Sequence, residues 1–329
     1  MLKTQRTLTK MAVAIGAGAI MATMPLIGQA AWEPQKPVEF VVMAGKGGGA
    51  DKAVRLLQSI IASENMAPVP FTPVNKPGGS GAEALVHMKG KKGDNHTIMF
   101  TLNSFYTTPL RQKALGIDIT TFTPVARMAE DTFLLWVHSD RKDINNMADF
   151  AKAAKAKGNK WIMAGTGKNS EDNLLTDFLN TAYDLDMKYV PYKGGGKVAK
   201  ELAGKNADST VNNPSEQLGF YEAGTTKAIA SFTDDRLPLF PDTPTFKELG
   251  KDYVYYMQRT VVGAPGMSKE AAAYYQGLFK KVFNSAKWQE YRTKKSLQGD
   301  LLQGDALMSY WKRERDVHET MLKNMGVLK

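Results

Sequence analysis

The sequence contains no cysteine among its 329 residues. This absence excludes disulfide bonds, thiolate zinc sites, cysteine-ligated iron–sulfur clusters and cysteine nucleophiles. It also excludes the lipid anchor of bacterial lipoproteins, which is attached to a cysteine. Histidine is scarce, because the chain has only His87, His96, His138 and His318, in neither H-x-H nor H-E-x-x-H spacing. We therefore expect no metal site and no cofactor.

Long hydrophobic runs are also missing, with one exception near the N-terminus. Basic residues there precede an apolar run over residues 11–27, and small residues flank Ala30. This order is typical of a secretory signal peptide, and the glycines and the proline disfavour an anchoring helix. We therefore expect cleavage near Ala30, removal of residues 1–30 and export of the mature chain. No later stretch reaches the roughly 18 apolar residues that span a bilayer.

Acidic residues are fewer than basic ones. The whole chain carries a net charge of +10, and removal of residues 1–30 leaves 40 basic and 33 acidic residues, a net charge of +7. Such a charge favours anionic partners without specifying one. The two densest basic runs, residues 89–92 and 312–315, lack interleaved aromatic residues. Nucleic acid is therefore not an expected partner of this exported chain.

Short runs rich in β-branched residues alternate with amphipathic stretches through much of the chain. The first series predicts strands over residues 38–43, 71–74 and 97–101 and helices from Asp51 and over 82–88. Asp51 is placed to cap the first helix. This alternation predicts an α/β layer structure with parallel strand pairing.

A second series and a helical tail follow. The predicted strands are 133–137, 161–164, 187–190, 209–211 and 227–231, and the predicted helices are 146–157, 171–182 and 197–203. From residue 268 the pattern is mostly helical, with a last helix over about 305–322. We expect two lobes: residues 32–132 plus 252–329, and residues 133–251, with the tail packing onto the first.

Two glycine-rich loops resemble nucleotide-binding motifs but fail their tests. Residues 45–50 fit G-x-G-x-x-A between a strand and a helix, yet Asn75 stands where a dinucleotide site needs an acid. Residues 165–169 lack the serine or threonine that follows the lysine of a phosphate loop. Ser80, between a strand and a helix, resembles a nucleophile elbow in which Ala82 replaces the last glycine. A secreted α/β serine hydrolase using Ser80 is therefore the alternative.

These loops share one property: they bring bare backbone N–H groups to helix N-termini, where negative groups are stabilised. Glycines can instead merely permit tight turns. Several such loops in both series favour a carboxylate-binding cleft. Asn103 and Ser104 also follow a predicted strand end, where such sheets bind ligands.

Four segments carry a family resemblance through their sequence and their order: GGGAD at 47–51, NKPGGSGA at 75–82, VPYKGGG at 190–196 and PDTPTFKELG at 241–250. With them the chain resembles the solute-binding receptors of tripartite tricarboxylate transporters, the TctC or Bug family. The resemblance implies a periplasmic, two-lobed Venus-flytrap protein with a ligand cleft between the lobes. It implies a receptor, not an enzyme, that hands a small organic carboxylate to a membrane permease. We expect a monomer.

The resemblance also implies which residues bind ligand. Carried over to this sequence they are Gly47, Gly48, Gly49, Ala50, Asp51, Gly78, Gly79, Ser80, Gly81, Thr166, Gly167, Lys168, Asn169, Ser170, Asn212 and Asn213. Lys46 and Lys168 depart from the usual family pattern. They either indicate a di- or tricarboxylate ligand or are solvated lysines on loop tips. We take the first as our prediction and include Lys46, with Asn103 and Ser104, in the candidate site.

Overall fold

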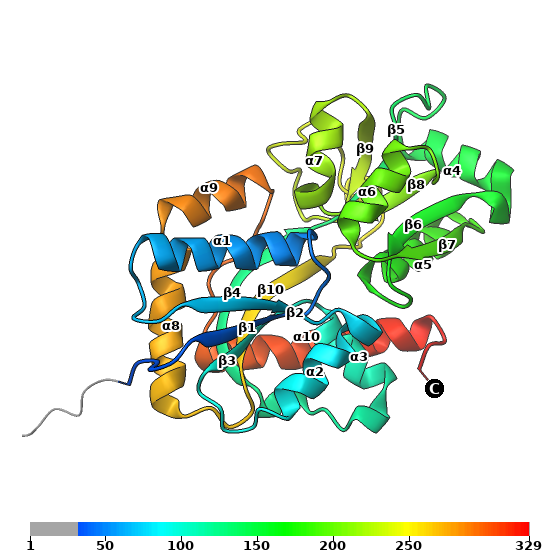
Figure 1. The fold of residues 1–329 in the computed structure, drawn as a ribbon. Coiled ribbons are helices and arrows are strands. Elements are labelled where there is room, and N and C mark those ends of the chain that lie inside the picture. The colour runs from blue at the N-terminus through cyan, green and yellow to red at the C-terminus, as the bar shows by residue number, and fades with distance from the viewer. Residues whose placement is uncertain (1–31, 329) are drawn as a thin grey trace, which may run out of the picture. The chain divides into compact units, whose positions relative to one another are not determined.

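The fold is that of a computed structural model that describes residues 32–328 (Figure 1). The predicted signal peptide, residues 1–30, lies outside the described residues. The described chain contains two five-stranded sheets, each covered by helices. None of the described helices is both long enough and apolar enough to cross a membrane.

The first sheet has the strand order β2-β1-β3-β10-β4. Its strands are β1 (Val38–Val42), β2 (Phe71–Asn75), β3 (Thr97–Thr101), β4 (Thr123–Thr132) and β10 (Tyr256–Gly263). β1 pairs parallel with β2 and β3, whereas β10 pairs antiparallel with both β3 and β4. A strand from late in the sequence therefore lies inside the sheet formed by the first third of the chain.

The second sheet has the order β7-β6-β8-β5-β9. Its strands are β5 (Leu134–His138), β6 (Ile162–Thr166), β7 (Lys188–Tyr192), β8 (Ser209–Asn212) and β9 (Thr226–Ser231). β6 pairs parallel with β7 and β8, whereas β5 pairs antiparallel with β8 and β9.

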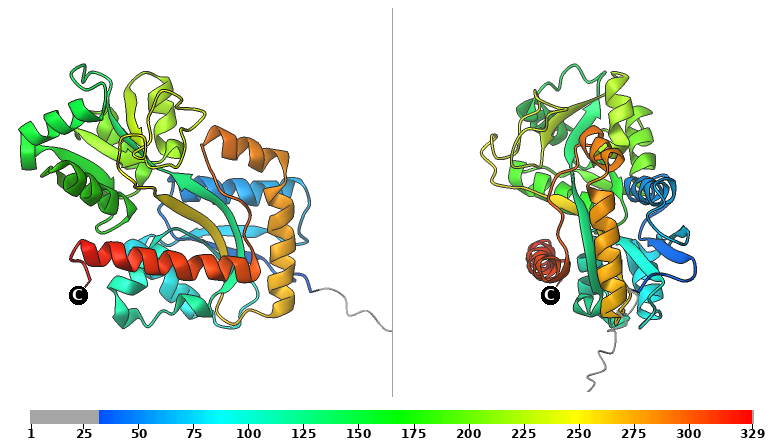
Figure 2. Two further views of the ribbon diagram at one scale, coloured as in Figure 1. Left: turned by 180° about the vertical axis from the view of Figure 1, so that it is seen from behind. Right: turned by 90° about the vertical axis from the view of Figure 1, so that its left-hand side faces the viewer.

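Helices follow most of the strands. They are α1 (Gly49–Ser63), α2 (Ala82–Lys89), α3 (Ser104–Arg111), α4 (Met147–Lys157), α5 (Glu171–Tyr183), α6 (Gly195–Ala203), α7 (Pro214–Glu222), α8 (Lys269–Phe283), α9 (Ala286–Lys294) and α10 (Gly304–Asn324). Short 3₁₀ turns occupy Gly78–Gly81, Lys113–Leu115, Ile119–Thr121 and Gly158–Lys160. Both α8 and α10 pack on β4 of the first sheet, and Figure 2 shows that the two helices run in different directions.

The expectation of parallel pairing is wrong for β10 and β5. β5 continues from β4 after a single residue, and β10 arrives from the second series of elements. Each of these two strands therefore enters its sheet from the side at which the parallel strands end. It must run antiparallel to them. Crossing from one lobe to the other thus fixes the direction of these two strands.

The sequence patterns also fail to predict β4, β10, α3 and α7. Charged residues interrupt the apolar pattern in β4 and β10, although Arg127, Asp131 and Arg259 are all buried. A proline at position 109 lies inside α3. The prediction that Asp51 caps the first helix is also wrong. α1 begins after Gly48, and Asp51 lies in its first turn, where its carboxylate accepts the N–H of Gly47.

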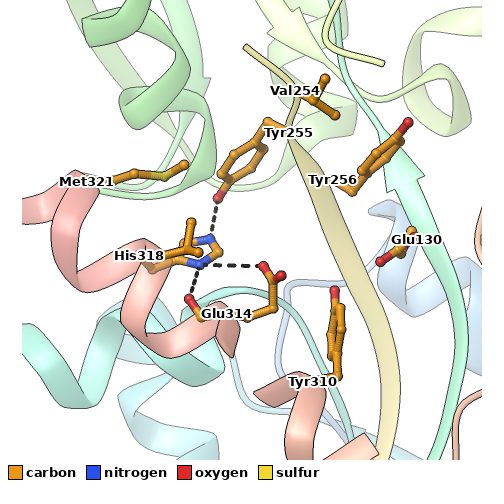
Figure 3. Close-up of a pocket in the computed structure, with 9 residues that line it drawn as sticks. Glu130, Val254, Tyr255, Tyr256, Tyr310, Glu314, His318 and Met321 are labelled. Carbon is orange, nitrogen blue, oxygen red and sulfur yellow. Dashed lines mark hydrogen bonds and ion pairs between the residues drawn. The ribbon is translucent and has the colours of Figure 1, made fainter. Parts of the chain in front are cut away.

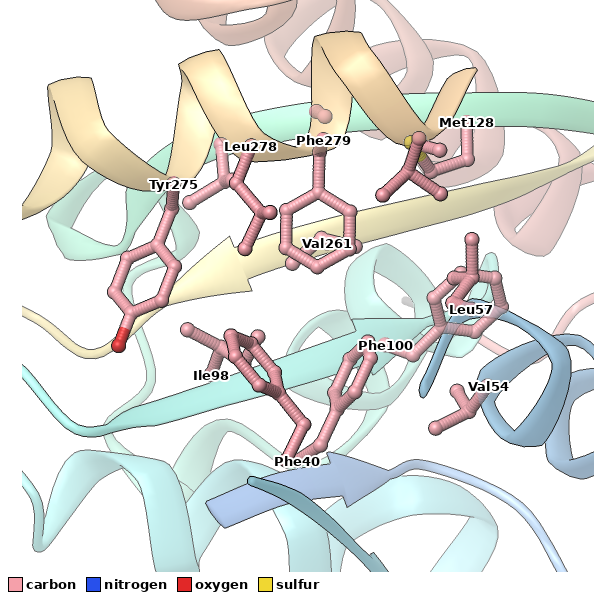
Figure 4. Packing of buried hydrophobic residues seen from close by; sticks show 14 of the residues in the cluster. Phe40, Val54, Leu57, Ile98, Phe100, Met128, Val261, Tyr275, Leu278 and Phe279 are labelled. Carbon is pink, nitrogen blue, oxygen red and sulfur yellow. The ribbon is translucent and has the colours of Figure 1, made fainter. Parts of the chain in front are cut away.

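Separate apolar clusters hold each sheet to its helices. In the first, the Phe40 ring lies edge-on to Phe100 and Phe279, with centroids 6.4 and 5.9 Å apart (Figure 4). α10 contributes to two clusters: Trp311 packs with residues of the first sheet, and Leu322 packs with residues of the second. The tail therefore reaches both lobes.

Candidate functional site

A cavity of about 600 Å³ lies at the carboxyl ends of strands from both sheets. The first sheet contributes the residues that follow β1, β2 and β3, and the second contributes those that follow β6, β7 and β8. Such strand ends are where open α/β sheets bind ligands. Several helices also begin at this cavity, among them α1, α3, α5 and α6, so their positive dipole ends face it.

Most of the predicted site residues line this cavity. They are Lys46, Gly48, Gly49, Ala50, Gly78, Gly79, Ser80, Gly81, Ser104, Thr166, Gly167, Ser170, Asn212 and Asn213. Gly47, Asp51, Asn103, Lys168 and Asn169 are not among the lining residues. The structure therefore brings together loops that are far apart in the sequence, as the strand-end pattern predicts.

Asp51 holds the first loop in shape. Its carboxylate accepts hydrogen bonds from Gly47 N at 2.9 Å, Arg55 Nε at 3.1 Å and Asn75 Nδ2 at 3.0 Å. Burial opposes ionisation of Asp51, but these hydrogen bonds together lower its pKa. Asn75, the residue that argued against a dinucleotide site, also donates to the Ala44 carbonyl at 3.0 Å.

Asn103 connects three elements beside the cavity. Its amide nitrogen donates to Tyr256 O at 2.8 Å and lies 3.1 Å from both Tyr255 Oη and His318 Nε2. Its amide oxygen accepts from Gln258 N at 3.0 Å. Asn103 is 1% exposed. It therefore ties the start of α3 to β10 and α10.

Beneath this connection lies a second, smaller cavity of about 130 Å³, which Figure 3 shows with His318 and Glu314 beside it. The Nδ1 atom of His318 is 2.7 Å from the Glu314 carbonyl oxygen, which can only accept a hydrogen bond. Nδ1 therefore carries the proton, and Nε2 accepts from Tyr255 Oη at 3.0 Å. Burial lowers the pKa of His318 to about 4.

The sequence patterns miss the acidic residues that line the large cavity: Glu171, Asp172 and Glu216. Burial raises the pKa of Glu171 and raises that of Asp172 well above its ordinary value. Asp172 accepts the N–H of Thr166 at 2.7 Å. Acids in the first turn of a helix normally serve the helix dipole, so only the preceding glycine-rich loop could have signalled a second role.

Arg259 lines the cavity from β10 and is paired with Asp131. Its Nε donates to Asp131 Oδ2 at 3.0 Å, and its Nη2 donates to the same oxygen. The two side chains are 3% and 1% exposed. Burial raises the pKa of Asp131 to about 6, against the opposing effect of Arg259. This cation is therefore largely offset by its own partner.

The lysines at the cavity are rim residues. Lys46 and Lys193 line it from different lobes, and both are exposed. Lys168 is exposed and lies outside the lining. Among residues 32–328 there is no cluster of three or more histidine or acidic side chains that could hold a metal ion.

The hydrolase alternative requires a base beside Ser80. Ser80 lines the cavity and has a positive φ of 55°, and its carbonyl accepts a hydrogen bond from Thr108 at 2.6 Å. His318 is held by Asn103 and Tyr255, and His138 accepts from the backbone N–H of Asp140. Neither of these two candidate bases is hydrogen-bonded to Ser80.

Two α/β lobes with a loop-lined cavity between them define a solute-binding protein of the periplasmic-binding-protein fold. The family model for the tripartite tricarboxylate transporter family receptor, TctC, matches residues 57–326, so the chain belongs to that family. The predicted family and two-lobed α/β fold are thereby confirmed. The family consists of solute-binding receptors rather than enzymes.

Individual relatives are distant in sequence, but their alignments cover about two thirds or more of the chain. A UPF0065 protein of Cupriavidus necator is 23% identical over 312 residues, which covers 94% of this chain and 93% of the relative. BugT of Bordetella pertussis is 24% identical over 225 residues, which covers 66% of this chain and 67% of the relative.

Solved structures agree in fold. The periplasmic binding protein BugD superposes with a TM-score of 0.83 at 23% identity, covering 90% of this chain and 99% of BugD. Rpa4515 of R. palustris with adipate gives 0.80 at 23% identity, covering 89% and 98%. MatC of Rhodopseudomonas palustris with bound malate gives 0.76 at 19% identity, covering 88% and 99%.

Proposed function

We propose that this protein captures a small organic carboxylate in the periplasm and delivers it to a membrane permease of the tripartite tricarboxylate type. One observation carries the proposal: glycine-rich loops from both lobes converge on one cavity at the N-terminal ends of several helices. Backbone N–H groups and helix dipoles at such ends favour a negatively charged group. Two relatives of the same fold were solved with carboxylic acids, adipate and malate.

The proposed lobes are residues 32–132 plus 252–329, and residues 133–251. Each contains one complete sheet, and the chain crosses between them at the β4–β5 junction and again before β10. A ligand held by loops of both lobes gains contacts that exist only when the lobes are together. That differential affinity stabilises the closed form relative to the open one.

We further propose that the ligand carries at least two carboxylates. Lys46 in the first lobe and Lys193 in the second both line the cavity at its rim. Lys193 thus takes the place in this proposal that the sequence pattern gave to Lys168, which lies outside the lining. A second carboxylate at the rim would meet a cation from each lobe.

A thermal-shift screen over mono-, di- and tricarboxylates and aromatic acids tests the function. A ligand that binds only the folded protein raises the melting temperature, by an amount that grows with concentration relative to Kd. We expect the largest shifts from dicarboxylates or tricarboxylates. If none of these acids shifts the melting temperature at millimolar concentration while neutral solutes do, the carboxylate assignment fails.

A further inference from the structure

Glu216 of the second lobe reaches across the cavity to the first lobe. It lies in α7, and its Oε1 atom accepts the backbone N–H of Gly49, the first residue of α1, at 2.7 Å. Its Oε2 atom accepts from the hydroxyl of Ser215 at 2.9 Å. A carboxylate of the protein itself therefore occupies a helix N-terminus that would suit a ligand anion.

The surrounding backbone leaves room for this carboxylate. A Cβ atom on Gly49 would lie 2.9 Å from Glu216 Oε1, and one on Gly195 would lie 2.8 Å from Glu216 Cδ. Neither glycine has a positive φ, so the backbone conformation does not require glycine at either place. Glycine here provides space, which the Glu216 side chain shares with Ser215 and Arg259 at Gly49 and with Asn212 at Gly195.

Glu171 makes a second contact of the same kind. It is the first residue of α5 in the second lobe, and its Oε1 atom accepts the N–H of Ser104, the first residue of α3 in the first lobe, at 3.0 Å. Two glutamates of one lobe thus each meet the N-terminus of a helix in the other. Hydrogen bonds to a charged acceptor are among the stronger ones in proteins.

We propose that Glu216 and Glu171 hold the lobes together in the empty receptor and select against anions that cannot displace them. The two carboxylates occupy the amides of Gly49 and Ser104 until a ligand carboxylate competes for them. The measured affinity for a ligand then reflects the difference between two binding free energies at the same backbone amides: that of the ligand carboxylate and that of the glutamate it displaces. The displacement step, though not the contact in the empty receptor, rests on the proposed function.

The test measures the distance between the lobes without ligand. Because the chain contains no cysteine, Ala62→Cys on α1 and Lys200→Cys on α6 place one spin label on each lobe at exposed sites. Pulsed dipolar spectroscopy should give one short, narrow distance for the empty protein. Glu171→Ala combined with Glu216→Ala should raise the population at longer distances by about tenfold or more.

Gly195→Ala repeats the test without a change of charge, since its new Cβ must push Glu216 aside. The matched control is Gly196→Ala, whose Cβ would make only an ordinary contact at 3.5 Å with the Gly47 carbonyl. Asp186→Ala, at an exposed position of the second lobe, controls for charge. A long distance in the empty wild type, or one unchanged in both the double variant and Gly195→Ala, would overturn the proposal.

Calorimetry with malate separates this proposal from the function. Glu216→Gln removes the competing charge and keeps the shape, so malate should bind about tenfold more tightly than to wild type. Equal affinities would contradict the displacement step. If malate binds neither protein, malate is not a ligand of this receptor. The inter-lobe distances then still decide whether the glutamates hold the lobes together.

Discussion

At the scale of single residues, position in the fold decides which ionisable groups can meet a ligand or a buried partner. Lys46 and Lys168 are alike in the sequence, each in a glycine-rich loop, but only Lys46 lines the cavity. Asp131 and Arg259 lie in strands that the sequence patterns miss, yet they form a pair that is almost wholly buried. A charge can be buried in this way only with its partner in place.

The two lysines give the first prediction. Lys46→Met should weaken binding of a dicarboxylate by about 1–2 kcal/mol more than binding of the monocarboxylate of equal chain length. Methionine keeps much of the apolar stem, so the difference reports charge. Lys168→Met is the control and should change neither affinity by more than about 1 kcal/mol. If calorimetric titrations show that Lys46→Met loses equal binding free energy for both acids, Lys46 is a solvated lysine that does not contact the second carboxylate.

His318 gives the second prediction. Burial lowers its pKa from 6.5 to about 4, so between these values the folded protein binds fewer protons than the unfolded chain. Stability associated with neutral His318 is therefore complete above pH 6.5 and falls as the pH drops toward 4. The loss amounts to about 3 kcal/mol.

Urea titrations of the wild type and His318→Gln from pH 7 to pH 4 check this expectation. Burial raises the pKa of Glu314, beside His318, and that of Asp131, so these groups push stability in the opposite direction as the pH falls. They act in both proteins and cancel in the difference. The wild type should lose about 3 kcal/mol relative to the variant, and parallel stability curves would contradict the assignment.

At the scale of elements, capping side chains mark the starts of some helices. Asn146 caps α4 by accepting the N–H of Asp149, and the sequence places that helix correctly. Ser268 caps α8 through the N–H of Ala271, and Ser285 caps α9 through that of Trp288. Ser80, by contrast, makes no cap hydrogen bond to α2, which begins after Gly81 in a left-handed conformation.

The third prediction concerns these caps. Ser268→Ala and Ser285→Ala should each lower the free energy of unfolding by about 1 kcal/mol, because each leaves a helix N–H without its acceptor. Thr320→Ala, at an exposed position inside α10, is the control and should stay within about 0.5 kcal/mol of wild type. Equal effects at all three positions in urea denaturation would show that the capping bonds contribute nothing specific.

At the scale of the whole molecule, the chain crosses between the sheets twice. β10 is hydrogen-bonded between β3 and β4, so the first sheet is incomplete until residue 263 has been added. α8 then packs on this sheet, and α10 contributes residues to apolar clusters of both sheets. No single cut divides the described chain into two complete sheets.

The fourth prediction follows from this connectivity. Limited proteolysis of the native protein should not release two independently stable halves by cleavage near residue 133. The N-terminal fragment would lack β10 and the helix that covers it, and so would expose the apolar residues around Phe40. Mass spectrometry of the products, with thermal melts of any isolated fragment, checks this. A fragment of residues 32–132 that melts cooperatively would contradict the proposed lobe boundaries.

The sequence by itself determined the α/β class, most strands and helices, and the loops that line the cavity, because these depend on local periodicity and on glycine at strand ends. The tertiary structure alone decided the direction of β5 and β10, the pairing of Asp131 with Arg259, and the contact of Glu216 with Gly49. The two side-chain contacts join residues that are 128 and 167 positions apart, and the two strand directions follow from the crossings between the lobes. Local sequence patterns report the preferences of neighbouring residues and carry no information about which distant charge will be buried beside which.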